Sequence, residues 1–315
     1  MFRFCCCVIV VSGLSLLGIR PVVADEPAFR IESSLGKLQV SWGQQPLATY
    51  VFDDRVVGRP YFRDVRTLDG TPTTRNHPPR EGTDATDHAT MHPGIWLAFG
   101  DLSGADFWRN KARVEHDGFF EAPRVDGPQA SFTIRNRYRS GDEILCTEVC
   151  RHRLLRHPTG WMLTYESTFT GERHFTFGDQ EEMGLGVRVS SPLAVKNGKG
   201  EILNSRGQRN EKNVWGQTAD WCDYRGTLEG RRIGLLLMPH PKNFRPCWFH
   251  ARDYGFVAAN PFGQNAFTKQ AKSRIEVKPG ESFQLRFSVL IHDTPVDQAF
   301  DAEAIYHGFV TADQQ

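Results

Sequence analysis

The sequence predicts an all-β fold, a large antiparallel β-sandwich made of two sheets. Short runs in which apolar and polar residues alternate recur along the chain, and they are rich in β-branched and aromatic residues. Glycine, proline, asparagine and aspartate separate these runs at near-regular spacing, and helical periodicity is scarce. Many strands without intervening helices are typical of a sandwich and not of a sheet covered by helices.

The beginning of the chain has the layout of a secretory signal peptide, which we expect over residues 1–24. Arg3 gives an early positive charge, an almost unbroken apolar run follows over 5–17, and residues 22–24 offer small side chains for cleavage. The run is shorter than a typical membrane span, although an uncleaved anchor is the alternative. No later stretch is long and apolar enough to cross a bilayer. We therefore expect a periplasmic or secreted protein without a membrane span.

Nine strands and one helix are expected along the mature chain. Residues 160–171 show the strand pattern most clearly, because Met162 and Glu166 point to one side while Leu163 and Tyr165 point to the other. Turn residues separate the runs, as in KNGKGE and RVDGPQ. The expected strands are 37–42, 48–52, 132–138, 143–149, 160–169, 184–189, 232–238, 255–259 and 282–291, and the closing helix is expected over 296–306.

One domain is the simplest organisation for residues 25–315. The sequence has no low-complexity linker and no clear internal repeat, and about 290 residues suit one large β-sandwich with an extended core. The segment 71–89 is long, polar and rich in proline. Loops of this length in a compact domain are usually functional or disordered, so this segment is a candidate for the functional site.

Composition and cysteine positions limit the partners and the covalent chemistry. The formal net charge is +1 and no stripe of lysine and arginine is present, so we do not expect a nucleic-acid partner. Cys146 and Cys150 are too far apart along an expected strand to bridge each other. Cys222 and Cys247 either form a disulfide, which an exported location permits, or are buried free thiols. No phosphate loop, HExxH or GxSxG motif occurs, and no cofactor is expected.

Side chains suited to sugar recognition gather in a few segments between 59 and 263. An aromatic ring can stack on the C–H face of a pyranose, and charged or amide groups bind its hydroxyls. This set of residue types predicts a carbohydrate ligand, although the same types line many polar clefts. The expected substrate-binding residues are Arg75, Trp215, Trp221, Trp248, Arg252, Tyr254 and Asn260.

Two histidines in the segment DHATMHPG are candidates for proton transfer. His88 and His92 lie four residues apart, but Pro93 follows directly and opposes a helix, so they do not form the usual two-histidine face of a zinc helix. A metal site would need a third ligand such as His77, His240 or a carboxylate. Proton transfer, metal binding and structural hydrogen bonding therefore stay open for the pair.

His240 and Glu181 are the other catalytic candidates. His240 lies between two prolines and has a restricted backbone, and a surface turn is its alternative role. Glu181 and Glu182 are neighbours that face opposite sides of a strand, so at most one points into a cleft. A solvated acidic turn is the alternative for both. Burial of one of them beside His88 would raise the carboxyl pKa and suit it to base chemistry.

Several stretches together resemble a bacterial family catalogued as "methane oxygenase PmoA". The match runs from about Arg59 to the C-terminus, and the motifs are specific only in combination. Members of the family are abundant in bacteria that degrade polysaccharides, and the resemblance implies no methane oxidation, since that membrane enzyme needs several spanning helices. Many members have a denser histidine run than this chain, in which three residues separate His88 and His92. The stretches are RPYFRDVRTLDGTPTTRNHP, DHATMHPGIWLAFGDLSGADFW, FGDQEEMGLGVRV, ILNSRGQRNEKNVWGQTADWCDYRG and HPKNFRPCWFHARDYGFVAANPFG.

The final stretch VKPGESFQLRFSVLIHDTP is similar, more weakly, to the last hairpin of galactose-mutarotase-type supersandwich proteins. That resemblance implies a concave cleft built from arginine, histidine and glutamate, but no single motif aligns well enough to transfer roles. We expect acid/base catalysis on a sugar by an epimerase, a lyase or a hydrolase. A non-catalytic glycan-binding module and a histidine-liganded metal enzyme are the alternatives. The catalytic hypothesis requires that the segments around Asp87, Glu181 and Pro239 meet in one hollow.

Overall fold

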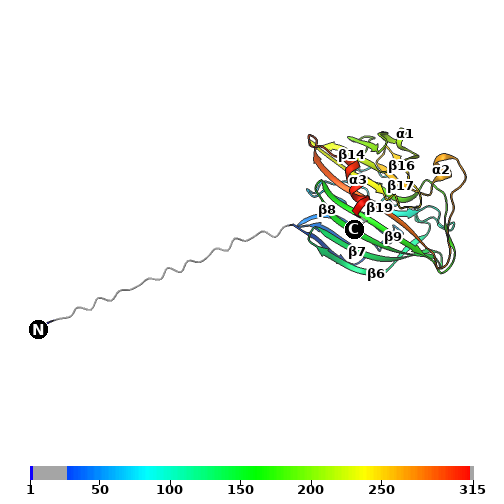
Figure 1. Ribbon diagram of the computed structural model, residues 1–315, viewed down its shortest axis with the longest axis horizontal. Coiled ribbons are helices and arrows are strands. Elements are labelled where there is room, and N and C mark those ends of the chain that lie inside the picture. Colours follow the sequence, from blue (N-terminus) through cyan, green and yellow to red (C-terminus); the bar gives the residue numbers. More distant parts are fainter. Residues whose placement is uncertain (3–26, 313–315) are drawn as a thin grey trace.

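The structure, a computed structural model, describes residues 1–2 and 27–312. Most of the expected signal peptide lies outside the described residues. Two large antiparallel sheets pack face to face, and the predicted fold class is confirmed (Figure 1). That residues 25–315 form one domain stays a prediction. No helix among the described residues is long and apolar enough to cross a membrane.

The nine-stranded sheet combines the N-terminal strands with strands from the middle and the second half of the chain. All its ladders are antiparallel, and β5 pairs with β11, which in turn pairs with β17. This pairing brings segments from three parts of the sequence side by side. In spatial order the strands are β1 (Phe29–Ser34), β2 (Lys37–Trp42), β3 (Gln45–Val51), β4 (Tyr61–Arg63), β5 (Ile95–Phe99), β11 (Met183–Arg188), β17 (Phe256–Asn260), β16 (Trp248–Arg252) and β13 (Gln217–Thr218).

The eight-stranded sheet contains the longest strands. A small sheet of β10 (Phe175–Phe177) and β18 (Ile275–Val277) lies apart from it in the pairing scheme. The strands of the large sheet in spatial order are β12 (Gly200–Asn204), β14 (Cys222–Leu228), β15 (Arg231–Pro239), β19 (Ser282–Pro295), β9 (Gly160–Thr170), β8 (Glu143–His157), β7 (Gln129–Ser140) and β6 (Arg113–Asp126).

Helices are few and short, in line with the scarce helical periodicity. A single 3₁₀ turn, η1 (Ser191–Leu193), precedes α1 (Asn210–Val214) and α2 (Gln264–Thr268). The closing helix α3 (Ala302–Thr311) begins six residues later than expected. Its start is set by Asp301, whose side chain accepts a hydrogen bond from the Ala304 N–H.

The core lies between the two sheets and follows the alternation read from the sequence. Leu163 and Tyr165 of β9 point into this core, whereas Met162 points to the opposite face and packs under α3. The four cysteines among the described residues are free and buried, so no disulfide joins Cys222 and Cys247. The sandwich is held by packing of apolar side chains, each of which contributes roughly 1.5–3 kcal/mol when fully buried.

Each sheet also has an outer face. The outer face of the nine-stranded sheet carries a second apolar cluster with Trp96, Trp108 and Phe256, which the segments between the strands cover. Helix α3 packs on part of the outer face of the eight-stranded sheet (Figure 1). Polar side chains line another part of this face. These two outer faces hold the hollows described below.

Candidate functional site

The outer face of the nine-stranded sheet brings together residues from the first and the second half of the chain. Alternation in β11 places Val187 in the core and sends Arg188 outward, and the turn after β16 carries Tyr254 to the same side. Together with Asp87 and His88 they line a hollow of about 560 Å³. We call it the His88 hollow. Its other lining residues are Arg75, Thr83, Ala85, Val189, Ser191, Ala194, Lys196 and Asn197.

Asp87 holds His88 in one orientation. The His88 Nδ1 atom lies 2.7 Å from Asp87 Oδ2, and both terminal nitrogens of Arg188 donate to the same carboxylate at 2.9 and 2.8 Å. Partial burial opposes ionisation, but the hydrogen bonds from Arg188 and His88 lower the pKa of Asp87 to about 2. Asp87 is therefore a carboxylate at neutral pH and accepts the Nδ1–H of His88, which leaves Nε2 for chemistry.

The backbone at His88 is strained, and a buried arginine holds it. His88 has φ of 51°, which non-glycine residues seldom adopt. The side chain of Arg75 is 1% exposed and donates to the carbonyl oxygens of Ala85, Asp87, His88 and His92. Such strain persists only where the surroundings over-determine the conformation, and it clusters at functional sites. Arg75 thus positions the histidine segment and has no terminal N–H left for a ligand.

Parallel rings form the floor behind His88. The His88 and His92 rings stack at 4.7 Å between centroids, and His92 stacks in turn on Phe256 at 4.5 Å and on Trp96 at 5.1 Å. Burial, followed by the charges of nearby His88, Arg188, and other cations, lowers the pKa of His92 well below its usual value. Neither ring nitrogen of His92 has a hydrogen-bond partner among the described residues. His92 is consequently a neutral, buried ring of the floor.

A second polar cluster lies on β16 beside this floor. Arg252 donates to Glu211 at 2.8 Å and lies 3.5 Å from Glu181 Oε2. His250 donates from Nδ1 to the Glu181 carbonyl and accepts from Arg252 Nε, an arrangement that requires the neutral ring with the proton on Nδ1. Burial, with a smaller effect of the Arg252 charge, lowers the pKa of His250 to about 3. His250 therefore orients Arg252, whose guanidinium also lies 5.7 Å from the Trp215 ring.

The remaining expected residues have other surroundings. The Asn260 side chain is fully buried, and its amide donates to the carbonyl oxygens of Gln180 and Glu181. It supports the segment that carries Glu181. Trp248 lies on the outer face of β16, where it stacks loosely on Phe267 at 6.3 Å.

The structure does not bring His240 or Trp221 to this hollow. His240 follows β15 of the other sheet and packs against Phe309 of α3 at 5.3 Å. Trp221 is buried under the same helix and donates to Glu303 at 2.9 Å. The expectation that the segment after Pro239 joins the segments around Asp87 and Glu181 is therefore wrong. Pairing of β15 with β19 fixes it in the eight-stranded sheet.

The geometry of the histidine pair does not suit a shared metal ion. Lone pairs of imidazole lie in the ring plane, and the planes of His88 and His92 are within 9° of parallel. Two stacked rings cannot both direct an in-plane nitrogen at one ion about 2.1 Å away. Among residues 1–2 and 27–312, no group of three or more His, Cys, Asp or Glu side chains could hold a metal ion.

The sequence alone gave no site role to Arg188, Glu211, His250 and Lys196. Arg188 had a usable signal, because Gly184 and Gly186 are the residues that share its face of the strand. The two glycines leave room for the Trp96 ring and the Ala259 backbone, so a lone arginine on this face of an apolar strand is the unusual residue. The others offer no comparable pattern, since their roles depend on pairing between distant strands.

Comparisons with known proteins complete the description of the site. No curated protein matches the chain. Among solved structures, the chain is similar to the galactosidase domain of alpha-galactosidase-sucrose kinase, AgaSK, with a TM-score of 0.42 and 9% identity over 84% of this chain and 42% of that one. It is also similar to a galactose mutarotase-like protein from Clostridium acetobutylicum, with a TM-score of 0.39 and 8% identity over 87% of this chain and 100% of that one. The resemblance to the family catalogued as "methane oxygenase PmoA" stays a prediction. Residues 37–306 match the model of a family of unknown function, DUF6807, and the chain belongs to this family.

Proposed function

We propose that the chain acts by acid/base catalysis on a carbohydrate bound in the His88 hollow. The observation that carries the proposal is the Asp87–His88 pair, fixed by Arg188, at the wall of a hollow of about 560 Å³. Ligand pockets of small molecules have volumes of roughly 300–1,000 Å³, so the hollow has room for one or two sugar units. An oriented, solvent-accessible histidine beside a carboxylate is an arrangement that suits proton transfer.

The surrounding side chains suit a polyhydroxylated ligand. Ser191, Lys196 and Asn197 supply donors and acceptors for hydroxyl groups, and the Tyr254 ring offers a partly exposed face near His88. Burial raises the pKa of Tyr254 to about 12, so its hydroxyl stays protonated at neutral pH and can donate.

In the proposed step, His88 Nε2 accepts a proton from a substrate carbon or hydroxyl, and the electron pair of the broken bond stays on the substrate. The Tyr254 hydroxyl, which lines the same hollow, is the complementary acid, whereas Glu181, the carboxylate expected from the sequence for this role, does not line it. His240 drops out of the mechanism, because it lies on the other sheet. Arg75 and His92 act as positioning residues. An exported location, expected from residues 1–24, is part of this proposal.

A screen in D₂O tests the proposal and separates the reaction types. The wild type is incubated with neutral and acidic oligosaccharides and the products are analysed by mass spectrometry. Epimerisation at carbon adds one deuterium, elimination creates an unsaturated product that absorbs in the ultraviolet, and hydrolysis creates new reducing ends. We expect one of these signals with the wild type and its loss in His88→Gln.

The matched control is His307→Gln. His307 pairs with Glu303 on the surface of α3 at 3.1 Å, so it reproduces a histidine–carboxylate pair away from the hollow. This variant should react like the wild type. Binding of a sugar in the hollow without any turnover would contradict catalysis and indicate a glycan-binding module. Turnover that His88→Gln leaves intact would refute the role of His88.

A further inference from the structure

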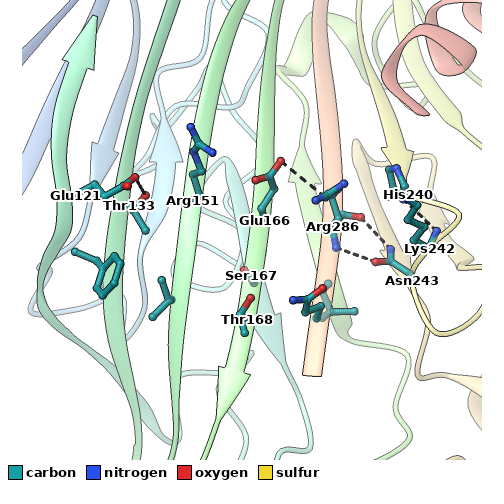
Figure 2. Close-up of a pocket in the computed structure, with 14 residues that line it drawn as sticks. Glu121, Thr133, Arg151, Glu166, Ser167, Thr168, His240, Lys242, Asn243 and Arg286 are labelled. Atoms are coloured by element: carbon teal, nitrogen blue, oxygen red, sulfur yellow. Dashed lines mark hydrogen bonds and ion pairs between the residues drawn. The ribbon is translucent and has the colours of Figure 1, made fainter. Parts of the chain in front are cut away.

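A second hollow, of about 570 Å³, lies on the outer face of the eight-stranded sheet, away from the His88 hollow. Its side chains come from five neighbouring strands, β6, β7, β8, β9 and β19, and from the segment after β15 (Figure 2). The strand register aligns them in one row. Glu121 opposes Thr133, Thr133 opposes Arg151, Arg151 opposes Glu166, and Glu166 opposes Arg286. Neighbouring strands lie about 4.8 Å apart, so the row crosses about 19 Å of sheet. We call this surface the Arg151 row.

The hollow over the row carries more positive than negative side chains. Glu166 is paired with Arg153 at 2.5 Å and with Arg286 at 3.8 Å, so two guanidinium groups share this carboxylate. Arg151 is exposed and makes no ion pair within the described part of the chain, and Lys242 is exposed at the edge of the same hollow. Among the side chains that line the hollow, the cations Arg151, Lys242 and Arg286 outnumber the carboxylates of Glu166 and Glu121, and Arg151 and Lys242 are exposed. The excess favours an anionic ligand, since an arginine fork binds carboxylate and sulfate groups in two parallel hydrogen bonds.

The hollow has a fixed wall and an apolar rim. Asn243 is buried at one end, where its amide donates to the Arg286 carbonyl at 2.9 Å and its oxygen accepts the Arg286 N–H at 2.8 Å (Figure 2). This pair of bonds secures the segment with Lys242 to β19. At the opposite end the Phe120 ring is 63% exposed. Gln284, with other polar side chains, lines the space between the two ends.

We propose that the Arg151 row binds an acidic polysaccharide, with carboxylate or sulfate groups, as an anchoring site distinct from the His88 hollow. Charge complementarity specifies the anion. The choice of a glycan among polyanions rests on the proposed function and on Phe120, whose exposed ring can stack on a sugar face. Neutral hydrogen-bonding groups between the cations match hydroxyls, which a simple polyphosphate lacks. A chain anchored here raises the local concentration of polymer for the enzyme.

Affinity electrophoresis and calorimetry on the full chain test the site. The probes are polygalacturonate, a neutral dextran and inorganic polyphosphate. We expect binding to polygalacturonate that weakens at least tenfold in Arg151→Gln/Lys242→Gln and falls as salt rises, with no comparable binding to dextran. Phe120→Ala should weaken polygalacturonate binding about threefold or more and leave polyphosphate binding unchanged. Arg173→Gln is the control, because Arg173 is an exposed arginine paired only loosely with Glu143 at 3.6 Å.

These experiments test the anion-binding site independently of the proposed catalysis. Equal binding of dextran and polygalacturonate, or binding that Arg151→Gln/Lys242→Gln does not weaken, would overturn the anionic site. Binding of polyphosphate and polygalacturonate with the same sensitivity to both variants would overturn the glycan assignment. His88→Gln should keep the polymer binding, so a failure of the proposed catalysis leaves this readout intact. Conversely, loss of polymer binding with unchanged turnover of short oligosaccharides separates the two sites.

Discussion

Replacing Asp87 by asparagine removes one negative charge at the His88 hollow while keeping the shape of the side chain. Asp87 accepts two hydrogen bonds from Arg188 and one from His88. The Arg188 side chain is only 1% exposed, so the variant leaves a buried guanidinium without its counter-charge. With its amide oxygen at the Oδ2 position, asparagine can accept from Arg188 Nη1 and His88 Nδ1, and its amide nitrogen then opposes Arg188 Nη2.

The expected loss of unfolding free energy in Asp87→Asn lies between two bounds. The pKa of Asp87 falls from 3.8 to about 2, which corresponds to about 2.4 kcal/mol at 1.36 kcal/mol per pH unit. Because Asp87 is 36% exposed, solvent screening reduces this value to about 1 kcal/mol. Removing one partner of a fully buried pair costs roughly 3–5 kcal/mol. We expect Asp87→Asn to lower the free energy of unfolding by about 2 kcal/mol, between these bounds.

The pH dependence of the unfolding free energy shows where the ionisation of the Asp87 carboxylate contributes to stability. The folded-state pKa of Asp87 is lowered, so its stabilisation is complete above the unfolded value of 3.8 and is lost only as the pH falls towards about 2. Between pH 8 and 5.5 the carboxylate stays ionised in both states. The ionisation of Asp87 itself therefore adds no pH dependence to the difference between the wild type and Asp87→Asn over this interval.

Urea denaturation followed by tryptophan fluorescence measures the difference, and ¹⁵N NMR of histidine reports which His88 nitrogen carries the proton. We expect a lower urea midpoint with an unchanged slope, and loss of the single Nδ1–H form. Asp69→Asn is the control, because Asp69 is 71% exposed and lies 3.9 Å from Arg231. Equal urea midpoints for the wild type and Asp87→Asn at pH 8 would refute the reasoning, and so would an equally large effect of Asp69→Asn.

Three further predictions concern the core and the histidine segment. Burial lowers the pKa of His152 to about 3, so below pH 6.5 the unfolded chain takes up a proton that the folded chain does not, and stability decreases as the pH is lowered. About 2 kcal/mol of unfolding free energy should be lost between pH 6.5 and 5, and the urea midpoint of His152→Phe should depend less on pH. Because His88 has φ of 51°, His88→Gly should be about 1 kcal/mol more stable than His88→Ala, and equal midpoints would argue against strain. A Cβ on Gly186 would lie 2.6 Å from the Trp96 ring, so Gly186→Ala should cost about 1–3 kcal/mol in thermal unfolding, whereas an unchanged Tm would show that the ring can move.

Alternation predicted strands such as β8, in which buried and more exposed residues follow each other in turn. The nine expected strands all occur, with shifts at their ends. β5 was not expected and lacks alternation, because Ile95 and Leu97 contact the main core and Trp96 the outer cluster; β11 and β17 are buried in the same way but were expected. β6 was missed for a different reason. Its ladder with β7 shifts register at His116, Phe119 and Glu121, and each shift breaks the period of two.

Local sequence identified chemical groups at the site, but pairing between distant strands decided which groups share a hollow. His88 and Tyr254 meet because β11 lies between β5 and β17, an order that no short motif specifies. His240 has an equally suggestive local sequence, yet its strand pairs with β19 and carries it to the other sheet. The position of Trp221 also depends on distant parts of the chain. Its ring is a hydrogen-bonded part of the interface with α3, and exposure to a ligand could not be judged before that helix was placed.

Arg75 shows how burial changes the meaning of a residue type at a binding site. Arginine beside histidine and aspartate suggests a ligand contact, but both terminal nitrogens of Arg75 are bonded to carbonyl oxygens of the segment that carries His88. A buried cation with these bonds cannot turn to a substrate without releasing the strained backbone. Contacts to a charged substrate must then come from cations at the edge of the hollow, of which Lys196 is the exposed one. One cation thus positions His88 and another is available to the substrate. Arg75→Gln should therefore lower stability, whereas Lys196→Gln should lower substrate affinity.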